Sequence, residues 1–254
     1  MSGSDGFRVD MHVKVLDEAV VERAKAHDID ALVYAPHFVR LPEIERRAAH
    51  FSDDDLLVLP AREVFTGPWR NRKHVLALGL SDPVPDFISL EGAMREIDRQ
   101  DAAALVPHPK FLNVSFSEPD VNEWNGLVDA VETYNPKLLF GTAETAREIA
   151  ENTDQSPFGS SYAHLRRSVG EVWTEFDESF DSGAAFVDAL KDGLTGEVER
   201  NTGLKHKLHC LAEFAHLGWE NSWQKIDRLF LQGTEPTHPR HIAYKGRFDD
   251  VAVY

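Results

Sequence analysis

The sequence predicts an α/β protein whose strands form a closed or nearly closed barrel. Two observations favour this fold class. Short apolar runs alternate with segments of helical period through the first 177 residues, and 254 residues are enough for one barrel of ordinary size. A chain that alternates strand and helix builds a mostly parallel sheet. The hydrophobic fraction of 42% supplies the buried core that this fold requires.

The individual elements follow in order along the chain. Strands are expected where β-branched and apolar residues concentrate, at 7–13, 30–35, 56–63, 74–80, 103–109 and 128–135. Helices are expected where apolar residues recur at helical spacing, at 17–27, 40–51, 89–100 and 142–152. Ser89 is a candidate N-cap for the third of these helices.

The alternation stops after residue 177. A helix is expected within 177–194, and one or two long amphipathic helices within 204–232, before an irregular tail. No internal repeat or low-complexity linker separates this part from the rest. We therefore expect a barrel over residues 1–180 and a C-terminal helical appendage, 181–254, packed on it.

Charge and composition restrict the classes of function. The chain has 43 Asp and Glu against 27 Lys and Arg, a formal net charge of −16, so its surface repels nucleic acid overall. A polyanionic substrate must therefore be held by a local basic cluster or by metal ions. Acidic excess with few lysines is typical of a salt-adapted cytoplasm, although an ordinary acidic soluble protein accounts for it equally well.

Targeting and redox features are few. No apolar run approaches the about 20 residues that span a bilayer. The polar start MSGSDG carries no secretory pattern, so we expect a cytoplasmic protein with no membrane partner. The single cysteine, Cys210, excludes an intrachain disulfide and a Cys-rich zinc site. Any metal would be held by His and carboxylate.

Six potential metal ligands stand at or just after short apolar runs. They are His12, His37, Glu63, His74, His108 and His164. Because strand ends on one face of a barrel converge on one mouth, these residues can meet there. Imidazole and carboxylate ligands suit Zn, Mn or Fe. The alternatives are hydrogen-bonded core histidines and, for the glutamate, an ion pair with Arg62 or Arg70.

The order of these motifs resembles the PHP (polymerase and histidinol phosphatase) family of metal-dependent phosphoesterases over residues 8–177. The matching segments are DMHVK (10–14), APH (35–37), ARE (61–63), KHVL (73–76), VPHP (106–109), VETYN (131–135) and SYAH (161–164). The resemblance implies a distorted (β/α)7 barrel of TIM type, here with a C-terminal helical extension. It also implies up to three divalent ions at the barrel mouth.

Three positions depart from the family pattern: Lys14, Pro36 and Tyr162 stand where the family has a His and two Asp ligands. An ammonium ligates no metal unless it deprotonates, and proline has no side-chain donor. We therefore expect one or two divalent ions, not three.

The resemblance places Glu63, His74 and His108 around one ion. It places His37 and His164 around a second ion, with Asp17 or Glu18 as candidate additional ligands. His12 would remain from the ligand position whose partners are replaced by Lys14 and Tyr162.

The resemblance also assigns roles in catalysis. The catalytic positions would be Glu63, His108 and Lys14. The Lys14 ammonium can neutralise the Glu63 carboxylate and face a phosphate. Phosphate binding is expected at basic residues near the motifs, namely Arg40, Arg62, Arg70, Arg72, Lys110 and Arg166. A solvated basic face is the alternative for this group.

The C-terminal helix carries two further sets of residues. We expect His206, His209 and His216 to lie on a solvated face, because Lys205 and Lys207 flank them. The aromatic residues of this region are expected to pack against the barrel, with a homo-oligomer interface as the second interpretation; they are Phe214, Trp219, Trp223 and Phe230.

Two functions remain open at this point. The first is hydrolysis of a phosphomonoester, or of a nucleotide or oligonucleotide phosphate, by a metal-bound water. The partner would then be a phosphorylated small molecule or a nucleic-acid end. The second is a catalytically degenerate PHP-like barrel that binds a phosphate-bearing ligand or a protein. The departures from the family pattern at Lys14, Pro36 and Tyr162 are the sequence feature that distinguishes between these two functions.

Overall fold

The structure is a computed structural model that describes residues 6–68, 70–110, 114–138, 142–219 and 236–253. Its strands are β1 (Phe7–Val13), β2 (Ala31–Tyr34), β3 (Leu57–Thr66), β4 (Lys73–Leu78), β5 (Ala103–Val106), β6 (Ala130–Tyr134), β7 (Ser156–Gly159), β8 (Val172–Phe176) and β9 (Glu197–Arg200). Its helices are α1 (Glu18–Ala26), α2 (Leu41–Phe51), α3 (Leu90–Arg99), α4 (Glu118–Glu123), α5 (Thr142–Asn152), α6 (Gly183–Lys191) and α7 (Leu204–Trp219), with 3₁₀ turns η1 (Arg166–Ser168) and η3 (Ile242–Tyr244).

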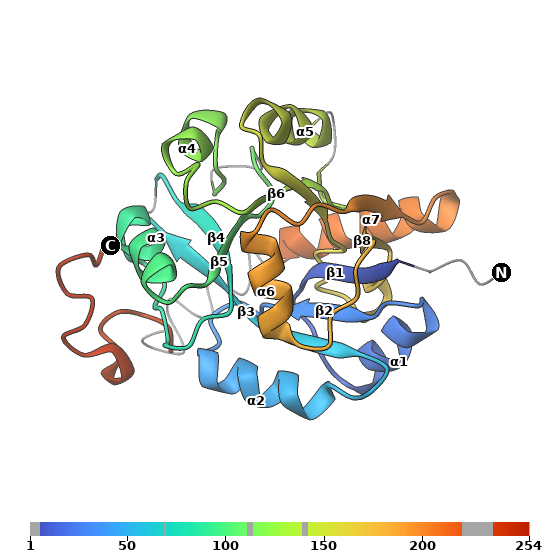
Figure 1. Ribbon diagram of the computed structural model, residues 1–254, viewed down its shortest axis with the longest axis horizontal. Helices are drawn as coiled ribbons and strands as arrows, with labels where there is room; N and C mark the ends of the chain where they lie inside the picture. Colours follow the sequence, from blue (N-terminus) through green and yellow to red (C-terminus); the bar gives the residue numbers. More distant parts are fainter. Residues whose placement is uncertain (1–5, 69, 111–113, 139–141, 220–235, 254) are drawn as a thin grey trace.

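Within the described residues, nine strands form one sheet in the order β7-β6-β5-β4-β3-β2-β1-β8-β9. The sheet curls into a nearly closed barrel surrounded by helices (Figure 1). The end strand β7 approaches the other end of the sheet, and the Gly159 N–H donates to the Thr174 hydroxyl of β8 at 2.9 Å. A Cβ atom on Gly159 would collide with Val198 of β9, so a glycine permits this close approach. The expected α/β barrel is confirmed.

The expectation of a mostly parallel sheet is wrong, because the sheet is mixed. The pairs β1–β2, β2–β3, β5–β6 and β6–β7 are parallel, whereas β3–β4, β4–β5, β1–β8 and β8–β9 are antiparallel. The connection from β3 to β4 is far shorter than the dozen residues that a parallel crossover needs. It turns through Gly67 at φ 75°, where a Cβ atom would lie 2.5 Å from the Asn71 carbonyl oxygen.

Local sequence signals fix the helix starts. The Asp17 side chain accepts from the Val20 N–H at 3.1 Å and begins α1. Ser89 accepts from the Gly92 N–H at 3.0 Å, as its candidate N-cap role required. Helices α1 and α2 bury Val20, Ala24, Ile44 and Ala48 against the outer face of the first strands.

Helix α6 covers one end of the barrel, across the middle of Figure 1. Its residues Phe186, Val187 and Leu190 join the apolar cluster that fills the barrel interior, together with the first buried residues of β1 and β2. This is the end where the parallel strands begin. The opposite end, where they finish, is left for polar side chains.

Residues after 180 add a strand to the barrel sheet and also pack on the outside of the barrel. Strand β9, which the sequence pattern did not indicate, pairs with β8. Tyr244 and Phe248 of the tail are buried beside α3. The expected helix over 204–232 appears as α7, and its remainder, with Trp223 and Phe230, lies outside the described residues. No helix within the described ranges is long and apolar enough to cross a membrane.

Candidate metal centre

Glu63 is the centre of the cluster that the strand ends bring together. Its carboxylate is fully buried, and Oε1 lies 3.0 Å from Nδ1 of His74 and 3.0 Å from Nε2 of His108. Its Oε2 atom lies 2.7 Å from Nε2 of His37 and 2.5 Å from Nζ of Lys14. One carboxylate therefore gathers residues from four separate segments of the chain.

Strand pairing explains why His74 meets Glu63. In the antiparallel pair β3–β4, Glu63 stands opposite Leu76, and His74 stands opposite Phe65. Glu63 and His74 are thus diagonal neighbours on one face of the ladder, within reach of long side chains. The His74 ring stacks on Phe65 with centroids 4.0 Å apart, which fixes its plane.

A buried carboxylate holds His108 in place. His108 leaves β5 with a left-handed φ of 36°, and its N–H donates to Glu132 at 2.7 Å. Glu132 also accepts from the Asn135 side chain at 2.8 Å and from the Ser160 hydroxyl. Burial raises the pKa of Glu132. The VETYN segment therefore orients the histidine.

The donor set fits a divalent ion. One ligand atom from each of Glu63, His74 and His108 lies within 4.8 Å of the others, the single such group in the part of the chain that the structure describes. Burial lowers the pKa of His74, which keeps the imidazole neutral, the form that ligates metal. Burial opposes ionisation of Glu63, but Lys14 and the imidazoles outweigh it and hold its pKa well below the ordinary value.

His12 supplies an independent observation on the chemistry of this cluster. Both of its ring nitrogens are buried without a hydrogen bond, and Nε2 lies 3.9 Å from Oε2 of Glu63. Buried polar atoms are almost always paired, so this imidazole fits a site that takes a cation. Burial, with Lys14 beside it, holds the pKa of His12 well below its ordinary value.

Lys14 and Tyr162 fill the space around these ligands. The Lys14 ammonium donates to Glu63 and to the Ala35 carbonyl oxygen at 2.6 Å. The Tyr162 ring lies 4.7 Å from the His12 ring and 5.2 Å from the His108 ring, centroid to centroid. Two of the departures from the family pattern therefore stand in the middle of the cluster.

The expected second pair, His37 and His164, also lies at this mouth. Their ring centroids are 5.4 Å apart. However, Nδ1 of His164 lies 2.5 Å from Nζ of Lys137. Burial lowers the pKa of His37 to about 3, and burial with the Lys137 charge holds that of His164 well below its usual range. Asp17, the candidate additional ligand, instead caps α1 and accepts from Arg166 at 2.6 Å.

The basic residues expected to bind phosphate differ in their contacts and in their exposure. Arg40 pairs with Glu43 at 2.7 Å on α2. The Arg72 guanidinium lies 4.4 Å from the Phe87 ring centroid, and Arg70 and Lys110 are exposed. Arg166 and Arg167 line a cavity of about 460 Å³ together with His164. This last pair thus shares a cavity with a member of the histidine cluster.

Arg62 is a fully buried structural residue. Its guanidinium donates to Asp86 at 3.0 Å and to the Val39 carbonyl oxygen at 2.9 Å. Asp86 also accepts from the Thr237 hydroxyl at 2.5 Å, which ties the tail to the barrel. These bonds occupy Arg62 with protein partners, so we do not assign it to phosphate. The ion pair considered between Arg62 and Glu63 is replaced by the pair with Asp86.

The solvated face expected for the α7 histidines is wrong for two of them. His206 and His209 are buried, 7% and 9% exposed, and their Nδ1 atoms lie 3.3 Å and 2.8 Å from the Glu171 carboxylate. Arg23 contacts the same carboxylate at 2.9 Å. Helical period alone could not indicate which face of α7 packs. Phe214, expected to be packed, is 42% exposed.

Two functional candidates escaped the sequence reasoning. Lys137 is 1% exposed and stands two residues after the VETYN segment, which is the signal that could have found it. Glu213 is fully buried on α7, and its Oε2 lies 3.3 Å from Lys137 Nζ. No motif in the sequence marks Glu213.

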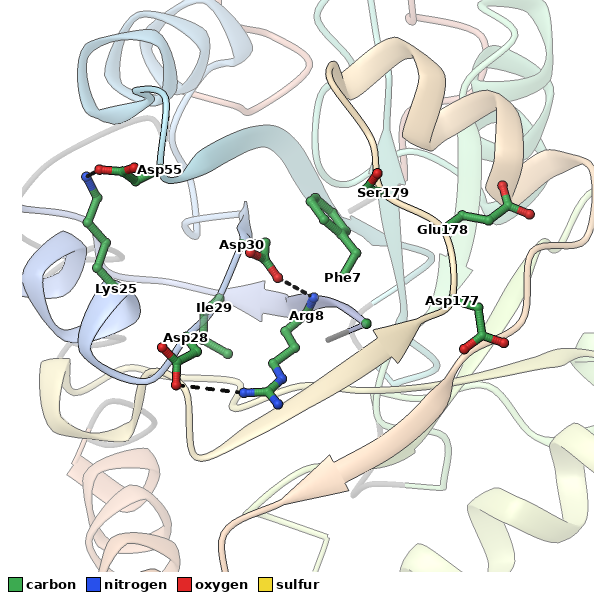
Figure 2. Close-up of a pocket in the computed structure, with 11 residues that line it drawn as sticks. Phe7, Arg8, Lys25, Asp28, Ile29, Asp30, Asp55, Asp177, Glu178 and Ser179 are labelled. Carbon is green, nitrogen blue, oxygen red and sulfur yellow. Dashed lines mark hydrogen bonds and ion pairs between the residues drawn. The ribbon is translucent and has the colours of Figure 1, made fainter. Parts of the chain in front are cut away.

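A larger cavity of about 610 Å³ lies at the opposite end of the barrel, beside the start of β1. Figure 2 shows its lining of acidic side chains with Arg8 and Lys25 among them. Arg8 lies 3.9 Å from Asp28, and Lys25 lies 3.4 Å from Asp55. Both basic groups of the lining thus pair with acidic ones, and no histidine lines the cavity.

Known proteins share this architecture. Residues 143–195 match the family described as PHP-associated. The fold is similar to that of PsfC from Pseudomonas syringae, with a TM-score of 0.63 and 16% identity over 85% of this chain and 99% of that one. It is also similar to a "putative metal-dependent phosphoesterase" from Bifidobacterium adolescentis, with a TM-score of 0.51 and 10% identity over 75% of this chain and 98% of that one. No curated protein sequence matches.

Fold and site together define a barrel with a His/Glu cluster at the end where its parallel strands finish. The chain carries a PHP-associated segment at 143–195 within a PHP-like α/β fold, which confirms the resemblance indicated by the motifs.

Proposed function

We propose that the chain is a metal-dependent phosphoesterase acting on a phosphomonoester or on a nucleotide or oligonucleotide phosphate. The buried group of Glu63, His74 and His108 carries this proposal, because its donor atoms lie within 4.8 Å of one another. A divalent Zn, Mn or Fe ion there would supply Lewis acidity toward a phosphoryl oxygen. The similarity to proteins of PHP-like fold is consistent with this chemistry.

The cations of the chain would hold the substrate. Arg166 and Arg167 stand beside His164 at a cavity of about 460 Å³, and guanidinium groups match phosphate oxygens in geometry. Lys14 adds a positive charge at the centre of the cluster. In a protein of net charge −16, this local positive charge would select for anionic ligands at this mouth.

Metal content and phosphatase activity of matched variants test the proposal. We expect protein purified without chelator to contain a transition metal, and Glu63→Gln to lose it along with at least about 100-fold of its activity on p-nitrophenyl phosphate. Glu43→Gln, at the 39% exposed partner of Arg40, is the control and should change neither. Equal metal content in the Glu63 variant and the wild type would exclude this carboxylate as a ligand.

One observation favours a second candidate function. The Lys14–Glu63 contact of 2.5 Å neutralises the carboxylate, yet an ammonium cannot lower the pKa of water toward neutrality as a metal does. A PHP-like barrel that binds a phosphate-bearing ligand without hydrolysing it is therefore the alternative. Calorimetric binding of inorganic phosphate, with no turnover in metal-loaded protein, would support this alternative over the phosphoesterase.

A further inference from the structure

Lys137 contacts three acceptor atoms of described residues in the barrel mouth. Its Nζ atom lies 2.9 Å from the Tyr162 carbonyl oxygen, 2.5 Å from Nδ1 of His164 and 3.3 Å from Oε2 of Glu213. The side chain is 1% exposed, so these contacts replace water around the ammonium. An ammonium has protons and no lone pair, so each of these three atoms accepts from it.

This arrangement fixes the position of the proton on His164. A charged imidazole this close to a buried ammonium is disfavoured by repulsion, so the ring is neutral and carries one N–H. Nδ1 lies 2.5 Å from the Lys137 ammonium and farther, 3.0 Å, from the Tyr162 carbonyl oxygen, and an ammonium cannot accept, so Nδ1 accepts from Lys137 and the proton lies on Nε2. A nitrogen that carries a proton cannot ligate a metal.

We propose that Lys137 and Glu213 make His164 a hydrogen-bond donor through Nε2–H, so that it binds an anionic oxygen of the ligand instead of a metal ion. The ligand oxygen would enter the cavity that His164 shares with Arg166 and Arg167. That this oxygen belongs to a phosphate rests on the proposed function. The tautomer assigned to His164 does not depend on the proposed function.

Glu213 is a positioning residue in this scheme. Its carboxylate accepts from the backbone N–H of His164 at 3.2 Å and of Leu165 at 3.0 Å, while balancing the charge of Lys137. It therefore fixes both the segment that carries the imidazole and the ammonium that sets the tautomer. Glu213 lies on α7, outside residues 143–195 that match the PHP-associated family.

Removing the ammonium should reverse the tautomer. Nδ1 of His164 lies 3.0 Å from the Tyr162 carbonyl oxygen, an acceptor that Lys137 also contacts. Without Lys137, Nδ1–H can donate to this oxygen, and Nε2 then carries the lone pair. The same ring would become a potential ligand beside His37.

Two-bond nitrogen–proton spectra of protein labelled with ¹⁵N-histidine test this inference, with His164→Gln to assign the resonance. We expect the Nε2–H tautomer in the wild type and the Nδ1–H tautomer in Lys137→Met. Lys245→Met, at an exposed lysine of the tail, should leave the pattern unchanged. Because Lys137→Met leaves Glu213 buried without its ammonium, the double variant with Glu213→Gln provides a second test and should show the same reversal. An Nδ1–H tautomer in the wild type would overturn the inference.

The ligand is tested separately with inorganic phosphate as the probe. Phosphate should shift the His164 Nε2–H resonance in the wild type and lose that effect when Arg166 and Arg167 are both changed to Gln. A phosphate that binds, by calorimetry, without moving this resonance would exclude His164 as its donor. Loss of hydrolysis with the tautomer intact would count against the proposed function alone.

Discussion

The Lys14 ammonium lies 2.5 Å from Oε2 of Glu63, the carboxylate on which the histidine cluster converges. A tethered cation thus stands where an additional ion could contact the same oxygen. Because Tyr162 fills the neighbouring space between His12 and His108, the two substitutions act on one position. We therefore expect these two side chains to control how many ions the mouth can bind.

Replacing Lys14 by His together with Tyr162 by Asp should raise metal stoichiometry by one ion per chain and increase phosphatase activity. The change removes the ammonium and supplies an imidazole and a carboxylate. Tyr162 has a left-handed φ of 44°, which Asp tolerates better than Tyr. Elemental analysis after Mn or Zn supplementation measures the result, with Lys245→His, at an exposed lysine of the tail, as the control. Unchanged stoichiometry in the double variant would show that the motif positions are misassigned, and Lys14→His alone should do less.

Arg62→Met should destabilise the fold by about 3–5 kcal/mol while leaving metal content unchanged, because it leaves Asp86 charged and buried. Urea unfolding measures the stability. Arg40→Met, whose ion pair with Glu43 is partly exposed, should cost no more than about 1 kcal/mol. A stable Arg62 variant with impaired phosphate binding would restore the phosphate role that the sequence indicated for this residue.

Glu171→Gln should loosen α7 from the barrel, with a loss of about 2 kcal/mol, since His206, His209 and Arg23 lose a common charged acceptor. Hydrogen exchange within α7 should accelerate relative to exchange in α3. Glu178→Gln, at an exposed position, is the matched control. Unaltered exchange in α7 would mean that its apolar contacts suffice to hold it.

Asp129→Asn should stabilise the protein at neutral pH but not at pH 4. Burial raises the pKa of Asp129 to about 6, above its unfolded value of 3.8, so the native state holds this proton more tightly. The contribution of protonated Asp129 to the free energy of unfolding is therefore fully present below about pH 4 and is lost as the pH rises through about 6. Allowing for partial exposure, we expect a gain of about 1 kcal/mol at pH 7. Urea titrations at both pH values measure it, with exposed Asp188→Asn as baseline; equal gains at both would contradict the assignment.

The sequence predicted the alternating strands and helices because side-chain period is a local property. It also predicted that Glu63, His74 and His108 meet, since family order supplied the long-range pairing. It could not predict that β4 runs antiparallel, which depends on the connection at Gly67 and not on the apolar run itself. Nor could it identify Lys137 and Glu213, because their meeting depends on how α7 docks.

The phosphate role of Arg62 illustrates the same limit. Closeness in sequence to Glu63 placed its charge near the cluster, but neighbouring strand residues point to opposite faces. Its guanidinium therefore lies with Asp86, across the sheet from the carboxylate beside it in the chain. The two side chains can be assigned to opposite faces of the sheet only once residues 62 and 63 are known to lie in a strand.

Strand β1 lies between β2 and β8, and α7 reaches the mouth through Glu213. The first strand of the chain therefore acquires its second neighbour only after residue 172 has been synthesised, and the His164 segment is completed some forty residues later. Contacts of such long sequence separation form late in folding. During translation, Glu63, His74 and His108 can thus meet before the barrel closes, so the residues proposed to hold a divalent ion come together before the rest of the mouth exists.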